Sequence, residues 1–137
     1  MLKAVARQGG AVCVNFGDEF LDERSWQAQQ TIWARVGRQK LPLKERWRVV
    51  KREVARLPPA PLARLIDHIA HIVDVAGIDH VCLGSDFDGV AATPRGLENV
   101  ARLPALTAAL RGRGYPPGDV EKILGGNVLR VLEANQP

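Results

Sequence analysis

Two short apolar runs, residues 11–16 and 81–86, constrain the fold of this chain most strongly. Both have the pattern of continuous buried strands, which is typical of parallel sheets covered on both faces. Parallel strands require a long crossover connection, and the residues between the two runs have largely helical patterns. The order strand, helical crossover, strand, helices therefore predicts an α/β protein.

Helical patterns occupy most of the remaining chain. A short helix over residues 2–7 ends at Gly9 and Gly10, and an amphipathic helix begins after Pro61 and ends at Gly77. Residues 21–57 are polar, basic and helical in pattern, and we interpret them as an insertion over the sheet. Further helical pieces are predicted at about residues 104–111, 117–124 and 127–134. Because two strands leave both sheet edges open, we expect the chain to be part of something larger.

Composition excludes several classes of protein. The 137 residues are 46% hydrophobic and 25% charged, as in an ordinary globular domain. No apolar run approaches the roughly 18–20 residues of a membrane span, so we expect no membrane span and a cytoplasmic location.

Nine basic residues lie between Arg35 and Arg56, and we interpret them as a solvated helix face and expect no nucleic-acid partner. Cys13 and Cys82 lack CxxC partners and are expected to be buried, reduced thiols.

The segment from Val81 to Gly89 carries the strongest sign of chemistry. It runs from an apolar strand into Asp86 and Asp88, at the end of a parallel strand where α/β proteins place reacting groups. Alternation along the strand places Asp86 on the same face as Gly84, and Gly89 permits a sharp turn. Asp86 is therefore the leading catalytic candidate, although Asp and Gly also favour turns without any chemistry.

The histidines give a weaker signal. His68 and His71 are three residues apart on a predicted helix, but no HExxH element accompanies them. We interpret them as part of a solvated polar face and not as zinc ligands. His80 precedes the second strand, at the end opposite Asp86, where residues usually serve stability.

Several motifs together resemble the membrane (renal-type) dipeptidase family. The resemblance runs in order over almost the whole chain and rests on residues 14–16, 67–72, 76–81, 84–89, 96–99 and 125–131. It implies a zinc-dependent enzyme with a binuclear metal centre on a TIM (β/α)8 barrel, hydrolysing dipeptides by metal-activated water. Residues 1–137 would form a single C-terminal segment of that barrel, contributing its last two β/α units with the helical insertion at about 21–57.

The same resemblance assigns roles to individual residues. Asp86 would orient the water or the substrate ammonium and pass a proton to the leaving amine. Asp88 would brace the loop, and Asn15, Gly17 and Gly89 would belong to the substrate loop, with Gly17 replacing an aromatic residue of many relatives. Family members take their metal ligands from a His-x-Asp pair on the first strand, a bridging Glu and two middle-strand histidines. The resemblance therefore implies that zinc is bound in the complete enzyme and that this chain supplies no metal ligand.

Two other interpretations stay open at this stage. An apolar strand followed by Asp-x-Asp-Gly-Val also resembles the first motif of haloacid-dehalogenase-type magnesium phosphatases, with Asp86 as nucleophile and Asp88 as acid/base. That motif normally opens its chain, and the residues that would complete the magnesium site are not evident downstream. The chain could instead be a non-catalytic partial barrel that oligomerises or pairs with the missing part of the barrel.

Overall fold

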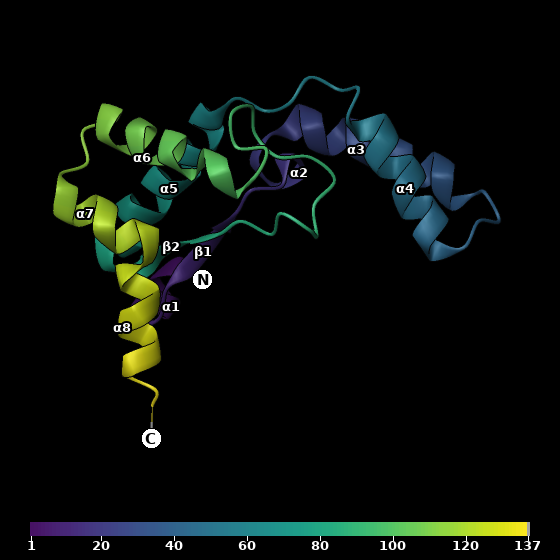
Figure 1. The fold of residues 1–137 in the computed structure, drawn as a ribbon. Coiled ribbons are helices and arrows are strands. Elements are labelled where there is room, and N and C mark those ends of the chain that lie inside the picture. The colour runs from purple at the N-terminus through teal and green to yellow at the C-terminus, as the bar shows by residue number, and fades with distance from the viewer. Residues whose placement is uncertain (137) are drawn as a thin grey trace.

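One parallel pair of strands organises the structure, a computed structural model that describes residues 1–136 (Figure 1). Strand β1 (Val12–Asn15) pairs with β2 (Val81–Gly84), and the register runs from Val12 opposite Val81 to Asn15 opposite Gly84. The predicted α/β class and the parallel pairing of the two apolar runs are confirmed.

Helices form the crossover and most of the remaining chain. Helix α1 (Leu2–Arg7) precedes the sheet, and four helices cross from β1 to β2, namely α2 (Asp18–Leu21), α3 (Glu23–Gly37), α4 (Leu43–Val54) and α5 (Leu62–Ala76). A 3-10 turn (Ile78–His80) leads into β2. After β2 the chain forms a 3-10 turn (Val100–Arg102), α6 (Leu103–Gly112), α7 (Pro117–Glu121), a π-type turn (Lys122–Gly126) and α8 (Asn127–Glu133). The helical pieces predicted from the sequence are confirmed, within a few residues at their ends.

The main core lies between the sheet and α5. The predicted apolar face of α5 is buried at Leu65, Ile66, Ile69 and Ile72, and it belongs to the same cluster as Val14 and Val81 of the strands. Helix α6 adds buried leucines to this cluster. Since alternate strand residues face opposite ways, the other face of the sheet carries Cys13 and Asn15 from β1.

Helices α3 and α4 form a hairpin with a small core of its own. Figure 1 shows this hairpin extending away from the sheet. Its buried residues and the partly buried alanines packed against them are Ile32, Val36, Val50, Val54, Ala91 and Ala92. Because the two alanines belong to the segment that follows β2, the hairpin lies beside that segment.

The amino ends of the strands are closed by polar contacts. His80 Nδ1 lies 2.7 Å from the Gly10 carbonyl oxygen, which confirms that His80 lies at the end opposite Asp86. The buried Asn127 side chain donates hydrogen bonds of 2.8 and 2.7 Å to the carbonyls of Ile78 and Val81. These contacts join α8 to the second strand.

The cysteines correct one expectation from the sequence. Cys13 and Cys82 form a disulfide, so the prediction of reduced thiols is wrong for this structure. The physical reason is the strand register, which places Cys13 directly opposite Cys82 with their Cα atoms 4.2 Å apart. The prediction of reduced thiols rested on the strand-like apolar run around each cysteine and on the missing CxxC spacing, and neither feature specifies the register of the two strands. Cys13 is exposed and Cys82 is buried.

The sheet has two free edges. Within residues 1–136, β1 and β2 pair only with each other, so one edge of each strand carries unpaired backbone groups. Throughout this part of the chain, no helix combines the length and apolarity needed to cross a membrane.

We expect reduction of the Cys13–Cys82 disulfide to destabilise the chain. The bond closes a loop over a sequence separation of 69 residues, and releasing such a loop costs about 4 kcal/mol in the chain-entropy treatment. Urea unfolding with and without a thiol reductant measures this difference. The double variant Cys13→Ser with Cys82→Ser is the control, and its stability should not respond to the reductant. Equal stability of the oxidised and reduced wild type would contradict the prediction.

Candidate active site

The residues that follow the two strands meet at the carboxyl edge of the sheet. Asn15 ends β1 opposite Gly84 of β2, so the segments that leave both strands begin side by side. Asp86 lies two residues beyond the end of β2, and the Asn15 side chain reaches its carboxylate. The structure therefore brings together two residues that are far apart in the sequence.

Asn15 holds one oxygen of the Asp86 carboxylate. Its Nδ2 donates a hydrogen bond of 3.1 Å to Asp86 Oδ2, and its Oδ1 accepts one of 2.6 Å from the Gly17 backbone N–H. The second bond fixes which end of the Asn15 amide faces Asp86, because an oxygen bound to Gly17 leaves the NH₂ group for the carboxylate. Asp86 itself is exposed, so its carboxylate is accessible to a ligand.

The backbone at Asp86 adopts an uncommon conformation. With φ of 56°, it is the only non-glycine residue among 1–136 in the left-handed region. Its carbonyl accepts hydrogen bonds of 3.0 and 3.2 Å from the N–H groups of Gly89 and Val90, which closes a tight turn. Strained conformations of this kind cluster at functional sites.

Gly89 makes room for the Asp86 carboxylate. A Cβ at position 89 would overlap Asp86 Oδ1 and lie 2.7 Å from its Cγ. The carboxylate therefore rests directly against the Gly89 backbone. The glycine predicted from the sequence to permit a sharp turn has, in addition, this steric role.

Gly17 and Asp88 lie at two different places around this pair. Gly17 is buried, and a Cβ there would lie 2.9 Å from side-chain atoms of both Phe20 and Val90, so these side chains occupy the space beside it. Asp88 is exposed, and within residues 1–136 its carboxylate has no hydrogen bond to the protein. It lines a cavity together with Gly89. The substrate-loop role of Gly17 and the bracing role of Asp88 stay predictions.

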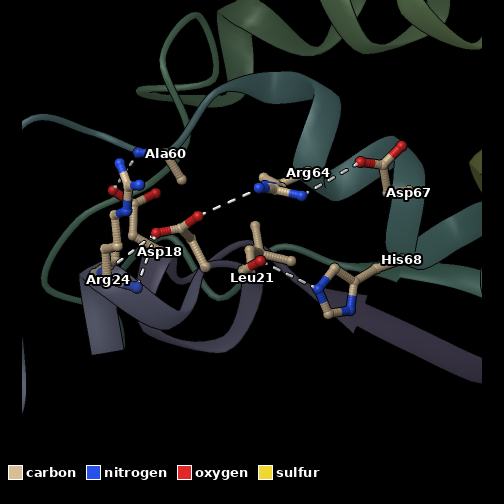
Figure 2. A network of polar contacts seen from close by, with 9 residues as sticks. Asp18, Leu21, Arg24, Ala60, Arg64, Asp67 and His68 are labelled. Carbon is tan, nitrogen blue, oxygen red and sulfur yellow. Dashed lines mark hydrogen bonds and ion pairs between the residues drawn. The ribbon is translucent and has the colours of Figure 1, made fainter. Parts of the chain in front are cut away.

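Asp18 is a buried acid that the sequence analysis missed. Only 2% of it is exposed, and its Oδ2 accepts a hydrogen bond of 3.0 Å from the Ala60 N–H (Figure 2). Its own backbone N–H donates to the Ala92 carbonyl at 3.1 Å. Asp18 thus joins the end of β1 to the Pro-rich connector that precedes α5 (residues 58–61) and to the segment after β2. The sequence offered one indication of Asp18, namely that this acid follows Asn15 by three residues at the strand end that carries the candidate site.

Burial changes the acidity of Asp18. Removal from water raises its pKa from 3.8 to about 6, although the Ala60 N–H favours the ionised form and acts in the opposite direction. The negative charges of Glu19 and Asp22 also raise the pKa, and the value of about 6 is the net result of all these contributions. Its Oδ1 is buried without a hydrogen-bond partner in the described part of the chain. Asp18 therefore changes its charge within the range of mildly acidic pH.

The histidines of α5 lie on its polar side. His68 Nε2 lies 3.2 Å from the Leu21 carbonyl oxygen (Figure 2). His71 is exposed. Arg64, on the same helix, lies 3.5 Å from Asp22 and 3.9 Å from Asp67. Across residues 1–136, no three His, Cys, Asp or Glu side chains form a group that could hold a metal ion. The described residues therefore do not fit a metal site.

Comparison with known proteins identifies relatives over the whole chain. A sequence model described as membrane dipeptidase (peptidase family M19) matches residues 1–137. Dipeptidase ataJ of Aspergillus terreus is 48% identical over 71 residues, which are 52% of this chain and 17% of that protein. The Klebsiella pneumoniae protein of the pqqA 5′ region is 34% identical over 132 residues, which are 96% of this chain and 38% of that protein.

Solved structures give the same result. A metallo peptidase from Rhodobacter sphaeroides, liganded with a phosphinate mimic of the dipeptide L-Ala-D-Ala, matches 98% of this chain with a TM-score of 0.70 and 28% identity. Dipeptidase AC, a metallo peptidase of family M19, matches 96% with a TM-score of 0.69 and 29% identity. The match covers 30% of each of those two chains, so this chain spans well under half the length of its relatives.

We expect the ionisation of Asp18 to make stability depend on pH. Since the pKa is raised on folding, the folded chain keeps a proton that the unfolded chain has lost, and this stabilisation is complete below about pH 4 and lost as the pH rises through about 6. The wild type should therefore lose up to about 3 kcal/mol relative to Asp18→Asn between about pH 4 and 7.

Urea unfolding at several pH values measures this difference. Asp74→Asn is the matched control, because Asp74 is exposed on α5 and the same substitution there should leave the pH profile unchanged. Parallel stability profiles for the wild type and Asp18→Asn would contradict the assignment.

Proposed function

The chain belongs to the membrane dipeptidase family, peptidase family M19, and we propose on this premise that it contributes the last two β/α units of a (β/α)8 barrel that hydrolyses dipeptides. The observation that supports this proposal most directly is the parallel pair β1–β2, which has one unpaired edge on each strand and the exposed Asp86 carboxylate at its carboxyl end. Catalytic residues of such barrels come from this end of the strands.

In this proposal Asp86 is the catalytic residue. Its Oδ2 is occupied by the Asn15 amide, and its carboxylate is exposed at the strand end. A carboxylate held in this way can take a proton from water and give it to the nitrogen that leaves when the peptide bond breaks. Asn15 acts as a positioning residue, since it donates to the carboxylate while Gly17 holds the other end of its amide.

In this proposal the metal ligands belong to the first six β/α units of the barrel and not to this chain. In the complete family enzyme, the zinc pair implied by the family resemblance would supply an activated water and polarise the peptide carbonyl. The described residues offer no group that could hold such ions. We therefore assign to this chain the proton transfer and the substrate contacts around Asp86.

Other interpretations of the same residues carry less weight. The family match over residues 1–137 does not favour a magnesium phosphatase with Asp86 as nucleophile. We propose that the free strand edges pair with the remaining barrel strands, or with a second copy when these are absent, because unpaired edges readily accept another strand. The cytoplasmic location expected from the sequence stays a prediction.

Complementation tests the proposed function. The chain is mixed with a polypeptide that supplies the first six β/α units of a family member, zinc is added, and the release of free amino acids from dipeptides is measured. We expect hydrolysis that neither polypeptide gives alone. Failure of the assembled protein to hydrolyse any dipeptide would contradict the proposal.

Substitution of Asp86 tests its assigned role in the same assay. Asp86→Asn should lower kcat by a factor of about 10² to 10⁴, because the amide cannot carry the proton, and zinc content should be unchanged. Asp74→Asn, the same substitution at an exposed position of α5, is the control and should retain full turnover. An Asp86→Asn protein with wild-type kcat would end the assignment.

A further inference from the structure

The α3–α4 hairpin and the turn after β2 border an open, shallow cavity of about 470 Å³. The first turns of α4 contribute Leu43, Lys44 and Trp47, and the turn contributes Asp88 and Gly89. The volume lies within the usual range for small-molecule sites. None of the roles derived so far uses this cavity.

The cavity has an apolar surface held in place by the hairpin. Leu43 is 73% exposed, although it lies at the start of a helix whose later apolar residues are buried. The Trp47 ring lies 5.7 Å from that of Trp33 on α3, and the Lys51 ammonium lies 5.6 Å from the Trp47 ring centre. The Trp47 ring is thus fixed before any ligand arrives. Lys44 and Asp88 carry opposite charges, so the surroundings favour a neutral group over a charged one.

Gly89 connects the cavity to the candidate active site. One side of this residue lines the cavity, and the Asp86 carboxylate rests against it, where a Cβ would overlap Oδ1. A substrate whose leaving nitrogen lies at Asp86 therefore has the next side chain within reach of the cavity. In a dipeptide, that side chain belongs to the C-terminal residue.

We propose that the cavity formed by Leu43, Lys44, Trp47, Asp88 and Gly89 binds a large apolar side chain of the C-terminal residue of a dipeptide substrate. The proposal rests on the proposed function and deepens it, because it names a substrate class. The segment 21–57, which contains the α3–α4 hairpin, would then help to select substrates. Loops at the carboxyl end of barrel strands commonly have this role.

Binding to the 137-residue chain tests the proposal without catalysis. Alanyl-phenylalanine and alanyl-glycine are titrated separately, while NMR follows the Gly89 amide and the Trp47 indole N–H, which Trp47→Phe identifies. We expect alanyl-phenylalanine to shift both signals and alanyl-glycine to bind about tenfold more weakly. Leu43→Ala should weaken the binding of alanyl-phenylalanine about tenfold. Equal affinity for the two dipeptides, or no effect of Leu43→Ala, would overturn the proposal.

The control for this variant is Leu129→Ala. Leu129 is 59% exposed on α8, and the same truncation there should leave both affinities unchanged. Because Leu43 is itself largely exposed, its truncation should preserve the fold, and the dispersion of the spectrum checks this directly.

Hydrolysis by the assembled barrel separates this inference from the proposed function. Leu43→Ala should lower kcat/KM for alanyl-phenylalanine about tenfold and leave that for alanyl-glycine unchanged. Hydrolysis with an unchanged ratio overturns the cavity proposal and leaves the dipeptidase function standing. Binding that depends on Leu43 but is accompanied by no hydrolysis contradicts the dipeptidase function and supports the cavity.

Discussion

The parallel register of β1 and β2 is the constraint on which the rest of the structure depends. It places Asn15 opposite Gly84, so the segments that leave the two strands emerge side by side. A slip of one residue would turn Asn15 to the other face of the sheet and separate it from Asp86. Packing of α5 against one face and the Cys13–Cys82 bond on the other oppose such a slip. A parallel pair of only four residue pairs would be weak on its own. The packing of α5 and the disulfide therefore both contribute to holding the register.

The candidate site is built from backbone as much as from side chains. Asp86 occupies the left-handed region, and its carbonyl closes the turn by accepting hydrogen bonds from Gly89 and Val90. The absence of a side chain at position 89 lets the carboxylate lie where the Asn15 amide can reach it. The cost of the unusual conformation, roughly 1–3 kcal/mol for such residues, is offset by these surrounding contacts.

The segment between β1 and α5 contains the α3–α4 hairpin and follows the carboxyl end of β1. Its hairpin has a separate small core, and partly buried Ala91 and Ala92 pack against that core. Asp18 adds a polar link, because its side chain accepts from Ala60 and its backbone donates to Ala92. The hairpin, the connector and the turn that carries Asp86 are therefore joined by contacts that converge near the same strand end.

The sequence by itself determined the elements and the leading acid. Apolar periodicity defined α5, glycines marked its end, and an apolar run ending in Asp86 placed that residue at a strand terminus, because these are local properties of the chain. Only the tertiary structure decided that Cys13 lies opposite Cys82, that Asp18 is buried against Ala60, and that Leu43 faces the same cavity as Gly89. Each of these contacts joins residues more than forty positions apart, and no local pattern encodes which distant segments meet.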